Sequence, residues 1–155
     1  MFVMGQERDY IIHDETQIKG FFGDYRFLSN FHPAPVLFEG EMYPSSENAY
    51  QAAKCANLSD KVQFLTCNPA QAKKLSKTIL VKEGWHSMKY DAMAAIVFDK
   101  FYRNPDIRQG LIELRQKYLE ETNHWGDVYW GVCKGKGENK LGKILMGTRA
   151  IWNSK

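Results

Sequence analysis

The stretch FHPAPVLFEGEMYPSSENAYQAAKC, residues 31–55, contains both kinds of secondary structure from which this chain is built. An apolar run from Val36 to Tyr43 is interrupted by Glu39-Gly40, a pattern that predicts two strands joined by a hairpin turn. After Pro44 the residues change to the serines, carboxylate and alanines that are typical of a helix start. A hairpin followed directly by a helix favours an α+β fold.

The helix after Pro44 is predicted to have a polar stripe and an alanine face. Ser45 or Ser46 suits the N-cap position, and Glu47 falls in the first turn. Successive helical residues turn by about 100°, so Glu47 and Lys54 lie about 20° apart, with Gln51 between them. The opposite, buried face is formed by alanines: Ala49, Ala52, Ala53 and Ala56. The polar stripe is expected to face solvent or a cleft. Two interpretations remain: Glu47 complements the helix dipole beside a solvated lysine, or the pair does chemistry.

Further elements are predicted on both sides of this stretch. A strand is expected around Ile18–Phe22, and helix starts at residues 59–65 and 68–77, where Asn68 caps and Pro69 takes the first helical position. A long amphipathic helix is expected from His86 to Arg103. Its buried side is predicted to be Tyr90, Met93, Ala94, Val97, Phe98 and Phe101.

The C-terminal third is expected to begin with another helix. Residues 104–122 start with Asn-Pro and carry this buried side: Ile107, Leu111, Leu114 and Leu119. A short strand is predicted at residues 127–132, and a final helix from about Asn139 to Trp152. No repeat or linker interrupts the chain. These elements predict one mostly helical α+β domain over residues 1–155, with its core at about 18–152 and a small sheet near the N-terminus.

Composition places the chain among ordinary globular proteins. It has 155 residues, of which 44% are hydrophobic and 25% charged, enough for one domain with its own core. Aromatic residues make up 14%, more rings than a small core needs, which favours a pocket lined by rings. A net charge of +3 is too small for a nucleic-acid carrier but suits a protein that handles anionic small molecules.

Targeting signals and metal sites are not expected. No run of about 18 apolar residues occurs, and residues 1–14 have neither a signal-peptide core nor an amphipathic transit pattern, so a cytoplasmic protein is predicted. Cys55, Cys67 and Cys133 lie far apart and form no C-x-x-C, which favours neither disulfides nor zinc. The four histidines also lack ligand spacing. Neither a metal nor a cofactor is predicted.

Residues 123–146, NHWGDVYWGVCKGKGENKLGKILM, combine polar and aromatic side chains densely. In an extended segment Asp127 and Tyr129 would share one face, with Val128 and Trp130 on the other. The following GKGEN has glycines, backbone amides and a capping Asn139 at a helix start, which favours phosphate binding. The alternative is a flexible loop with solvated basic tips.

Two smaller clusters are ambiguous. In GDYRFLSNF, residues 23–31, Arg26, Ser29 and Asn30 lie among aromatic rings where a binding loop is common, although Asn30 can also cap a turn. Trp85 and Lys89, one turn apart at the start of the long helix, form either a packing anchor or a ligand platform.

Together these segments resemble the NADAR superfamily, named for NAD and ADP-ribose, and within it the YbiA-like N-glycosidases of riboflavin biosynthesis intermediates. The similarity runs from about Gly20 to Arg149. It is carried by four motifs in family order: FLSNFHPAPV, YPSSENAYQAAK, NPAQAKKL and NHWGDVYWGVCKGKGENKLGKILM. Because several separate motifs agree, the resemblance implies the family's fold as well as its chemistry.

The resemblance assigns roles to particular residues. The E-x-x-Y/F-Q-x-x-K signature falls on Glu47 and Lys54, and the N-x-W-x-D-x-x-W-G motif begins at Asn123. Glu47, Lys54 and Asp127 are the implied catalytic residues. The expected substrate-binding residues are Arg26, Ser29, Asn30, Phe31, Trp85, Asn123, Trp125, Trp130 and Asn139. The chain departs from many members at Asn48 (His), Ser76-Lys77 (Gly-Arg) and Gly84 (Asp), which leaves the substrate more open than the reaction.

Family members are similar in cleaving N-glycosidic bonds between a ribose 5-phosphate or ADP-ribose unit and a base or amine. An oxocarbenium-like state at C1 needs a nearby carboxylate, help for the leaving base and a phosphate clamp. Glu47 and Asp127 can supply carboxylates, tryptophans can stack on the base, and Arg26 or residues 134–139 can bind phosphate. Lys54 can hold the leaving group or the phosphate or, if neutral, attack C1 and form a Schiff base.

The resemblance implies an N-glycosidase, with ribosylamino-pyrimidine 5′-phosphates of riboflavin biosynthesis as leading substrates. One alternative is an ADP-ribosyl hydrolase that removes ADP-ribose from guanine bases or other conjugates, including ADP-ribosylated nucleic acid. A second is a non-catalytic module that binds ADP-ribose or a nucleotide. The presence of both Glu47 and Asp127 favours the enzyme, because a binding module can do without carboxylates beside a phosphate. The oligomeric state stays open.

Overall fold

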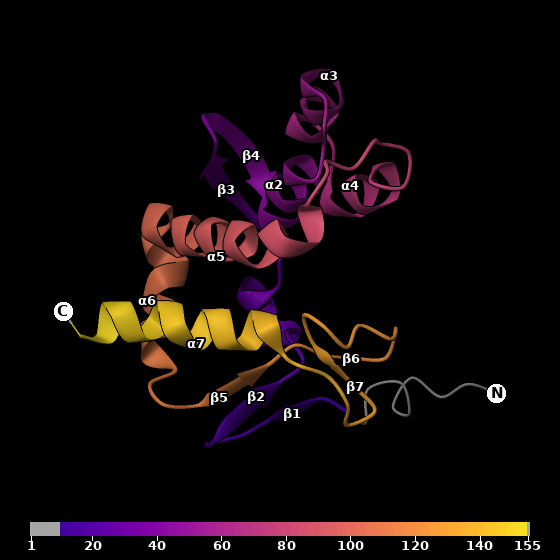
Figure 1. Ribbon diagram of the computed structural model, residues 1–155. Coiled ribbons are helices and arrows are strands. Elements are labelled where there is room, and N and C mark those ends of the chain that lie inside the picture. Colours follow the sequence, from indigo (N-terminus) through magenta and orange to yellow (C-terminus); the bar gives the residue numbers. More distant parts are fainter. Residues whose placement is uncertain (1–9, 155) are drawn as a thin grey trace. The chain divides into compact units, whose positions relative to one another are not determined.

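The computed structural model describes residues 10–154 as two compact units (Figure 1). The hairpin unit is Asn30–Arg108, and the terminal unit combines residues 10–29 with 109–154. Most of the N-terminal stretch in which no targeting signal is found lies outside the described residues. Within residues 10–154, no helix is both long and apolar enough to span a bilayer.

The hairpin unit begins with the predicted strand pair. Strands β3 (Pro33–Phe38) and β4 (Glu41–Ser45) are antiparallel. Between them Glu39 and Gly40 have φ angles of 49° and 84°, the left-handed conformations that a two-residue hairpin turn requires. The expected hairpin at Glu39-Gly40 is therefore confirmed.

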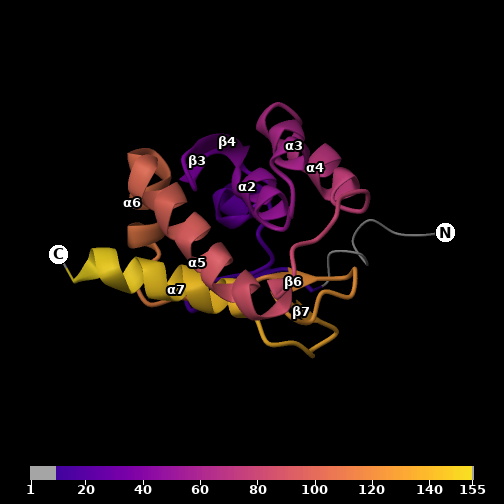
Figure 2. The same cartoon turned by 45° about the horizontal axis from the view of Figure 1, so that its top comes forward.

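Four α-helices follow the hairpin within this unit, and α6 begins at its end. The four are α2 (Ser46–Ala53), α3 (Leu58–Val62), α4 (Pro69–Leu75) and α5 (Trp85–Arg103), with a 3₁₀ turn, η2 (Gln63–Leu65), after α3; helix α6 spans Pro105–Glu113. Helix α2 is the centre of the unit, because it contacts β3, β4, α4 and α5 (Figures 1 and 2). All eight residues of α2 are consequently buried.

Side-chain caps explain where α2 and α4 start. The hydroxyl of Ser45 accepts a hydrogen bond from the Asn48 amide at 3.1 Å, so Ser45 rather than Ser46 caps α2. Asn68 and Gln71 form a reciprocal capping box at the start of α4, with Pro69 in the first turn as predicted. Asn48 itself donates to the carbonyls of Phe64 and Cys67 at 2.9 and 2.8 Å. This departure from the family pattern therefore ties α2 to the chain after α3.

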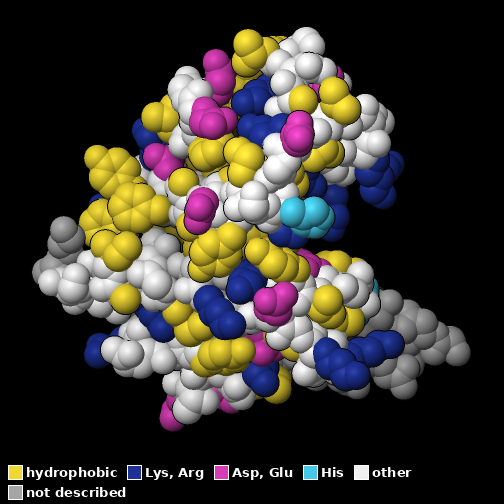
Figure 3. All heavy atoms as spheres, viewed as in Figure 1, with side chains coloured by type: hydrophobic (Ala, Val, Ile, Leu, Met, Phe, Trp, Pro, Cys, Tyr) yellow, Lys and Arg dark blue, Asp and Glu magenta, His cyan; other side chains and the backbone are white. Residues whose placement is uncertain are grey.

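Helix α5 matches its predicted bounds within one residue, but its buried face is rotated. Met93, Val97 and Phe101 are buried as expected, whereas Ile96 and Lys100 are also buried. The prediction was wrong for Tyr90 and Phe98, each 38% exposed. Hydrophobic side chains gather over the C-terminal half of α5, at the left of Figure 3.

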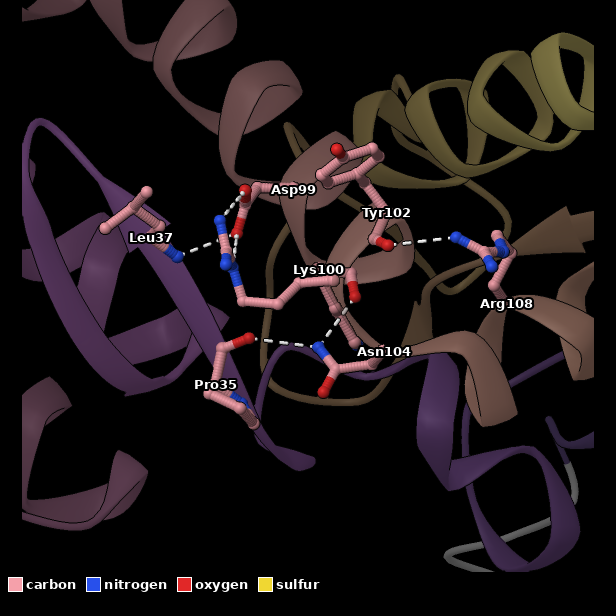
Figure 4. Close-up of polar contacts among 8 residues, drawn as sticks. Pro35, Leu37, Asp99, Lys100, Tyr102, Asn104 and Arg108 are labelled. Carbon is pink, nitrogen blue, oxygen red and sulfur yellow. Dashed lines mark hydrogen bonds and ion pairs between the residues drawn. The ribbon is translucent and has the colours of Figure 1, made fainter.

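Polar contacts fasten the C-terminal half of α5 to β3, which fixes this rotation (Figure 4). The Asp99 carboxylate accepts a hydrogen bond from the Leu37 amide at 2.7 Å and forms an ion pair with Arg103 at 2.9 Å. Asn104 donates to the Pro35 carbonyl at 3.0 Å. Asp99 must face β3 to make these contacts. The spacing of apolar residues in the sequence does not indicate this orientation.

The terminal unit contains a three-stranded sheet in the order β1-β2-β5. Its strands are β1 (Ile12–His13), β2 (Gln17–Lys19) and β5 (Tyr118–Glu120); β1 is antiparallel to β2, and β5 is parallel to it. A 3₁₀ helix, η1 (Gly23–Leu28), follows β2. The strand expected around Ile18–Phe22 is thus shorter, because Gly20 turns the chain with a φ of 91°.

The long helix predicted for residues 104–122 is wrong in its second half. Helix α6 ends at Glu113, and Arg115 adopts a left-handed φ of 57°. Tyr118–Glu120 then forms β5, where Leu119 is buried and pairs with Ile18. The spacing of Leu119 fits a helix face, but its pairing with Ile18 of β2 makes it part of a strand.

The rest of the terminal unit comprises two short parallel strands and the final helix. Strands β6 (Thr122–Asn123) and β7 (Val132–Cys133) pair with each other, and α7 runs from Lys140 to Asn153, close to its predicted bounds. Helix α7 lies against β5 (Figure 1). A Cβ atom on Gly142 would fall 2.2 Å from the Leu119 carbonyl oxygen, so only glycine permits this close approach.

Candidate active site

The Glu47 carboxylate is buried at the first turn of α2. Its side chain is 7% exposed, and its backbone amide donates to the Asn30 carbonyl at 3.0 Å. The Gln51 side-chain amide, one turn further on, donates to Glu47 Oε2 at 2.5 Å. The polar stripe therefore does not face open solvent, and a carboxylate held in the interior needs partners such as Gln51 to offset the cost of its burial.

Lys54 stands at the C-terminal end of α2 and is half-buried between rings. Its Nζ lies 5.2 Å from the centroid of the Tyr50 ring, and the Tyr50 ring lies 5.5 Å from that of Trp85, at the start of α5. Trp85 is buried and packs against α2 through this contact. The predicted Glu47, Lys54 and Trp85 are thus brought to one helix, with Tyr50 as an additional member.

The surroundings of Lys54 favour its neutral form. Burial is the main cause that lowers the pKa of Lys54 below the ordinary lysine value, and the positive charges of Lys89 and Lys73 lower it further. The negative charge of Glu47 opposes this shift by raising the pKa. A lysine with a lowered pKa is partly neutral closer to physiological pH, and a neutral amine is a nucleophile.

Buried polar atoms without hydrogen-bond partners are concentrated around the same helix. Among the described residues, three such atoms, Asn30 Oδ1, Ser46 Oγ and Gln51 Oε1, belong to α2 or to the residue that bonds to its first turn, while others, including Arg149 Nη1, lie in α7. Each unsatisfied buried group costs roughly 1–3 kcal/mol, so a cluster of them calls for an explanation. A ligand rich in hydroxyl groups would supply the missing partners.

In the terminal unit, Asn123 and Asp127 build the loop between β6 and β7. Asn123 Oδ1 accepts hydrogen bonds from the Trp125 and Asp127 amides at 3.2 and 3.0 Å, and its Nδ2 donates to the Asp127 carbonyl at 2.9 Å. Asp127 Oδ1 accepts from the Tyr129 and Trp130 amides at 3.1 and 2.9 Å. These bonds curve the backbone, which is why the strand predicted for residues 127–132 is wrong and β7 begins only at Val132.

The glycine of the same motif is required by close packing. A Cβ atom on Gly131 would lie 2.1 Å from the Glu121 carbonyl oxygen and 2.7 Å from Asn123 Nδ2. Any larger residue would displace the Asn123 amide from its hydrogen bonds. Part of the family motif therefore maintains the shape of the loop.

The other predicted residues of the terminal unit differ in exposure. Trp125 is 48% exposed, while Trp130 is half-buried with its ring 4.7 Å from that of Tyr129. Arg26 is exposed within η1, and the amide of Ser29 donates to the Arg26 carbonyl at 2.9 Å. The two tryptophans and Arg26 thus keep surface available for a ligand.

Asn139 does not cap α7 as predicted. It occupies the N-cap position with a φ of 51°, but its side chain makes no capping hydrogen bond. Instead, its Nδ2 donates to the Leu119 carbonyl at 3.0 Å, and its Oδ1 accepts from the Glu121 amide at 3.0 Å. The Asn139 side chain is buried, and both its oxygen and its nitrogen form hydrogen bonds to the backbone. The structure therefore does not support the prediction that Asn139 contacts phosphate.

Two residues around α2 were not singled out from the sequence. Tyr50 lies inside the E-x-x-Y/F-Q-x-x-K signature, so its ring could have been assigned from the family motif. Lys73 stands in the last turn of α4, and its Nζ lies 6.0 Å from the centroid of the Phe31 ring. A surface lysine beside another lysine gives no signal in the sequence.

Among the described residues, no three His, Cys, Asp or Glu side chains gather to hold a metal.

The role of the Asp127 charge can be separated from its role in the loop. Asn at position 127 retains an oxygen that accepts from Tyr129 and Trp130, whereas Ala does not. If the charge acts in catalysis, Asp127→Asn should lose about a hundredfold in kcat with an unchanged Tm. Kinetics and thermal unfolding of Asp127→Asn and Asp127→Ala provide the measurement. An Asn variant with normal kcat and an impaired Ala variant would assign Asp127 to the loop alone.

The fold is of the α+β class, and its buried polar side chains include Glu47 and Gln51 on α2 in the hairpin unit and Asn123 at the loop between β6 and β7 in the terminal unit. The chain belongs to the NADAR domain family, whose sequence model matches residues 14–152. This match extends over parts of both units. The predicted family membership is confirmed.

Relatives of known name support the same assignment. The chain is 30% identical over 131 residues to N-glycosidase YbiA of Escherichia coli, a match that covers 81% of each chain. It is 33% identical over 130 residues to a riboflavin biosynthesis protein of Vibrio vulnificus, but there it spans 35% of the relative's length. The NMR structure of E. coli YbiA superposes with a TM-score of 0.80 at 27% identity, covering 94% of this chain and 90% of that one. This likeness confirms the predicted α+β fold.

Proposed function

We propose that the protein is an N-glycosidase that hydrolyses the bond between a phosphorylated ribose and a base or amine, with ribosylamino-pyrimidine 5′-phosphates of riboflavin biosynthesis as the first substrates to test. Relatives named N-glycosidase YbiA and riboflavin biosynthesis protein support both the reaction and this substrate class. The α2 helix supports the chemistry.

One observation carries the proposal: Glu47 is buried beside Gln51, and Lys54 is half-buried with a lowered pKa on the same helix. A carboxylate withdrawn from water stabilises the positive charge that develops at C1 more strongly than a solvated one. A lysine with a lowered pKa forms its neutral amine at lower pH than an ordinary lysine does, and the neutral amine can attack the same carbon. A simple binding module needs neither group.

The cluster of unsatisfied buried atoms supports a sugar ligand. Asn30 Oδ1 and Gln51 Oε1 are acceptors, and Ser46 Oγ can both donate and accept. Ribose hydroxyl groups are donors as well as acceptors, so they can pair with all three. Ordering the ribose through these bonds would fix C1 relative to Glu47 and Lys54.

A substrate panel tests the proposal directly. Ribosylamino-pyrimidine 5′-phosphates, ADP-ribosylated guanine and free ADP-ribose are incubated with the protein, and products are identified by mass spectrometry. We expect release of the base or amine together with ribose 5-phosphate. Release of ADP-ribose from guanine alone would establish the ADP-ribosyl hydrolase instead. Binding of ADP-ribose without any cleavage would establish a non-catalytic module.

A further inference from the structure

Lysines from three helices of the hairpin unit lie near enough to α2 for their charges to act on one another. Helix α2 contacts both α4 and α5; Lys54 ends α2, Lys73 lies in the last turn of α4, and Lys89 lies near the start of α5. Figure 3 shows Lys and Arg side chains gathered at the right-hand edge of this unit. Three separate elements thus contribute positive charge to the surroundings of Lys54.

Lys73 is directed toward the N-terminal end of α2. Its Nζ lies 6.0 Å from the centroid of the Phe31 ring. Phe31 directly follows Asn30, whose carbonyl accepts from the Glu47 amide at 3.0 Å. Within residues 10–154, no carboxylate lies within ion-pair distance of Lys73. The ammonium of Lys73 is therefore available to an anion that reaches the Glu47 end of the helix.

Lys89 belongs to α5, the helix that packs on α2 through Trp85. It follows Trp85 by four residues, so the two side chains share a face of α5. The Trp85 ring packs on the Tyr50 ring at 5.5 Å, and Lys54 Nζ lies 5.2 Å from that same Tyr50 ring. The face of α5 that carries Lys89 is thus the one turned toward Lys54.

The charges of these lysines interact. After burial, the charges of Lys89 and Lys73 are the causes that lower the pKa of Lys54, against the opposing effects of Glu47 and Cys55. Cations held near one another repel, and a bound anion relieves that repulsion. The start of α5 favours an anion as well, because its first turn has no acidic residue and its N-cap, Gly84, has no side chain.

We infer that Lys73 and Lys89, next to the half-buried Lys54, bind the 5′-phosphate of the riboside, an inference that rests on the proposed function. Lysine binds phosphate as a point charge and needs no fixed geometry, which suits two flexible side chains from different helices. The site differs from Arg26 and residues 134–139, the phosphate contacts expected from the sequence, since all of these belong to the terminal unit. It would select phosphorylated ribosides over free ones.

The test is a binding measurement that does not depend on catalysis. Ribose 5-phosphate and ribose are titrated calorimetrically into wild type, Lys73→Ala/Lys89→Ala and Lys74→Ala/Lys77→Ala. The second double variant removes the same total charge from exposed lysines that do not act on the pKa of Lys54. We expect the first to weaken ribose 5-phosphate binding about tenfold or more, and the second less than about twofold. Ribose binding should be equal in all three.

Rescue and pH dependence separate phosphate binding from a structural effect. Lys73→Arg/Lys89→Arg keeps both charges and should restore ribose 5-phosphate binding. In Lys73→Ala/Lys89→Ala the pKa of Lys54 should rise, because two repelling charges are gone, while Glu47 and Cys55 remain. If Lys54 acts as the amine nucleophile, the rising limb of kcat/KM against pH should then move to higher pH.

Failure of this inference is distinguishable from failure of the proposed function. If riboside is cleaved but both alanine double variants bind ribose 5-phosphate equally, the phosphate site is wrong and the N-glycosidase stands. Absence of ribose 5-phosphate binding to wild type would also overturn the site. A third outcome is that no riboside is cleaved, but Lys73→Ala/Lys89→Ala binds ribose 5-phosphate more weakly than the other two proteins do. That outcome would support the phosphate site and reject the N-glycosidase activity.

Discussion

Sodium borohydride added during turnover is expected to inactivate the protein by fixing a covalent adduct on Lys54. Neutral Nζ attacks C1 of the ribose, the N-glycosidic bond breaks, and the base leaves with the bonding electron pair and takes up a proton. The ring oxygen then leaves C1, is protonated, and an imine forms between C1 and Nζ. Borohydride reduces this imine to a stable secondary amine, whereas water would release the sugar and regenerate Lys54. Peptide mapping by mass spectrometry locates the adduct.

Substitution of Lys54 separates the covalent role from an electrostatic one. Lys54→Arg keeps the positive charge but cannot form an imine, so it should lose all measurable turnover. Lys61→Arg is the matched control, because Lys61 forms a surface ion pair with Glu39 at 3.3 Å and should retain full activity. If no adduct forms and Lys54→Arg keeps most of its activity, Lys54 is an electrostatic clamp and water attacks C1 directly.

The pH dependence of turnover provides a further check on Lys54. Because burial lowers the pKa of Lys54, the fraction of neutral amine rises with pH at values below those of an ordinary lysine. A covalent mechanism therefore predicts that kcat/KM increases as pH rises through this lowered pKa. A clamp that needs the charged ammonium predicts the opposite slope.

Local signals in the sequence were sufficient for much of the fold. The start of α4 follows from Asn68 and Pro69, the hairpin from Glu39-Gly40, and α7 from its apolar spacing. Each of these features depends on residues close together in the chain. The strand β5 does not: Tyr118–Glu120 is extended because it pairs with β2, which lies about a hundred positions earlier in the sequence.

The sequence predicts which residues of α2 belong to the candidate site, but it does not predict which other elements surround them. Helical spacing placed Glu47 and Lys54 on one side of α2, yet an alanine face suggested burial on the other side only. The structure surrounds α2 completely, because the strands, α4 and α5 all contact it. Lys73 and Lys89 become neighbours of Lys54 only through that packing. Their contribution depends on tertiary contacts that no spacing in the sequence reports.

Glu47→Gln is expected to lower kcat by about a hundredfold or more while the protein stays folded. Glutamine has nearly the same shape, and its amide oxygen can still accept the hydrogen bond from Gln51. Replacing a buried carboxylate by a neutral amide also removes a charge that is costly to desolvate, so Tm should not fall by more than a few degrees. Steady-state kinetics and thermal unfolding are measured on the same preparation, with Glu83→Gln, an exposed carboxylate in the same unit, as the control.

The Glu47→Gln variant can distinguish attack by Lys54 alone from a direct role of the Glu47 carboxylate, because Glu47 also affects the pKa of Lys54. The charge of Glu47 raises the pKa of Lys54, so its removal should lower that pKa and increase the fraction of neutral amine. If nucleophilic attack by Lys54 alone limited the rate, Glu47→Gln would be as fast as wild type or faster near neutral pH. A large loss would instead show that the carboxylate itself stabilises charge at C1 or positions water. A folded Glu47→Gln variant with a near-normal rate would remove Glu47 from the mechanism and leave the reaction to Lys54.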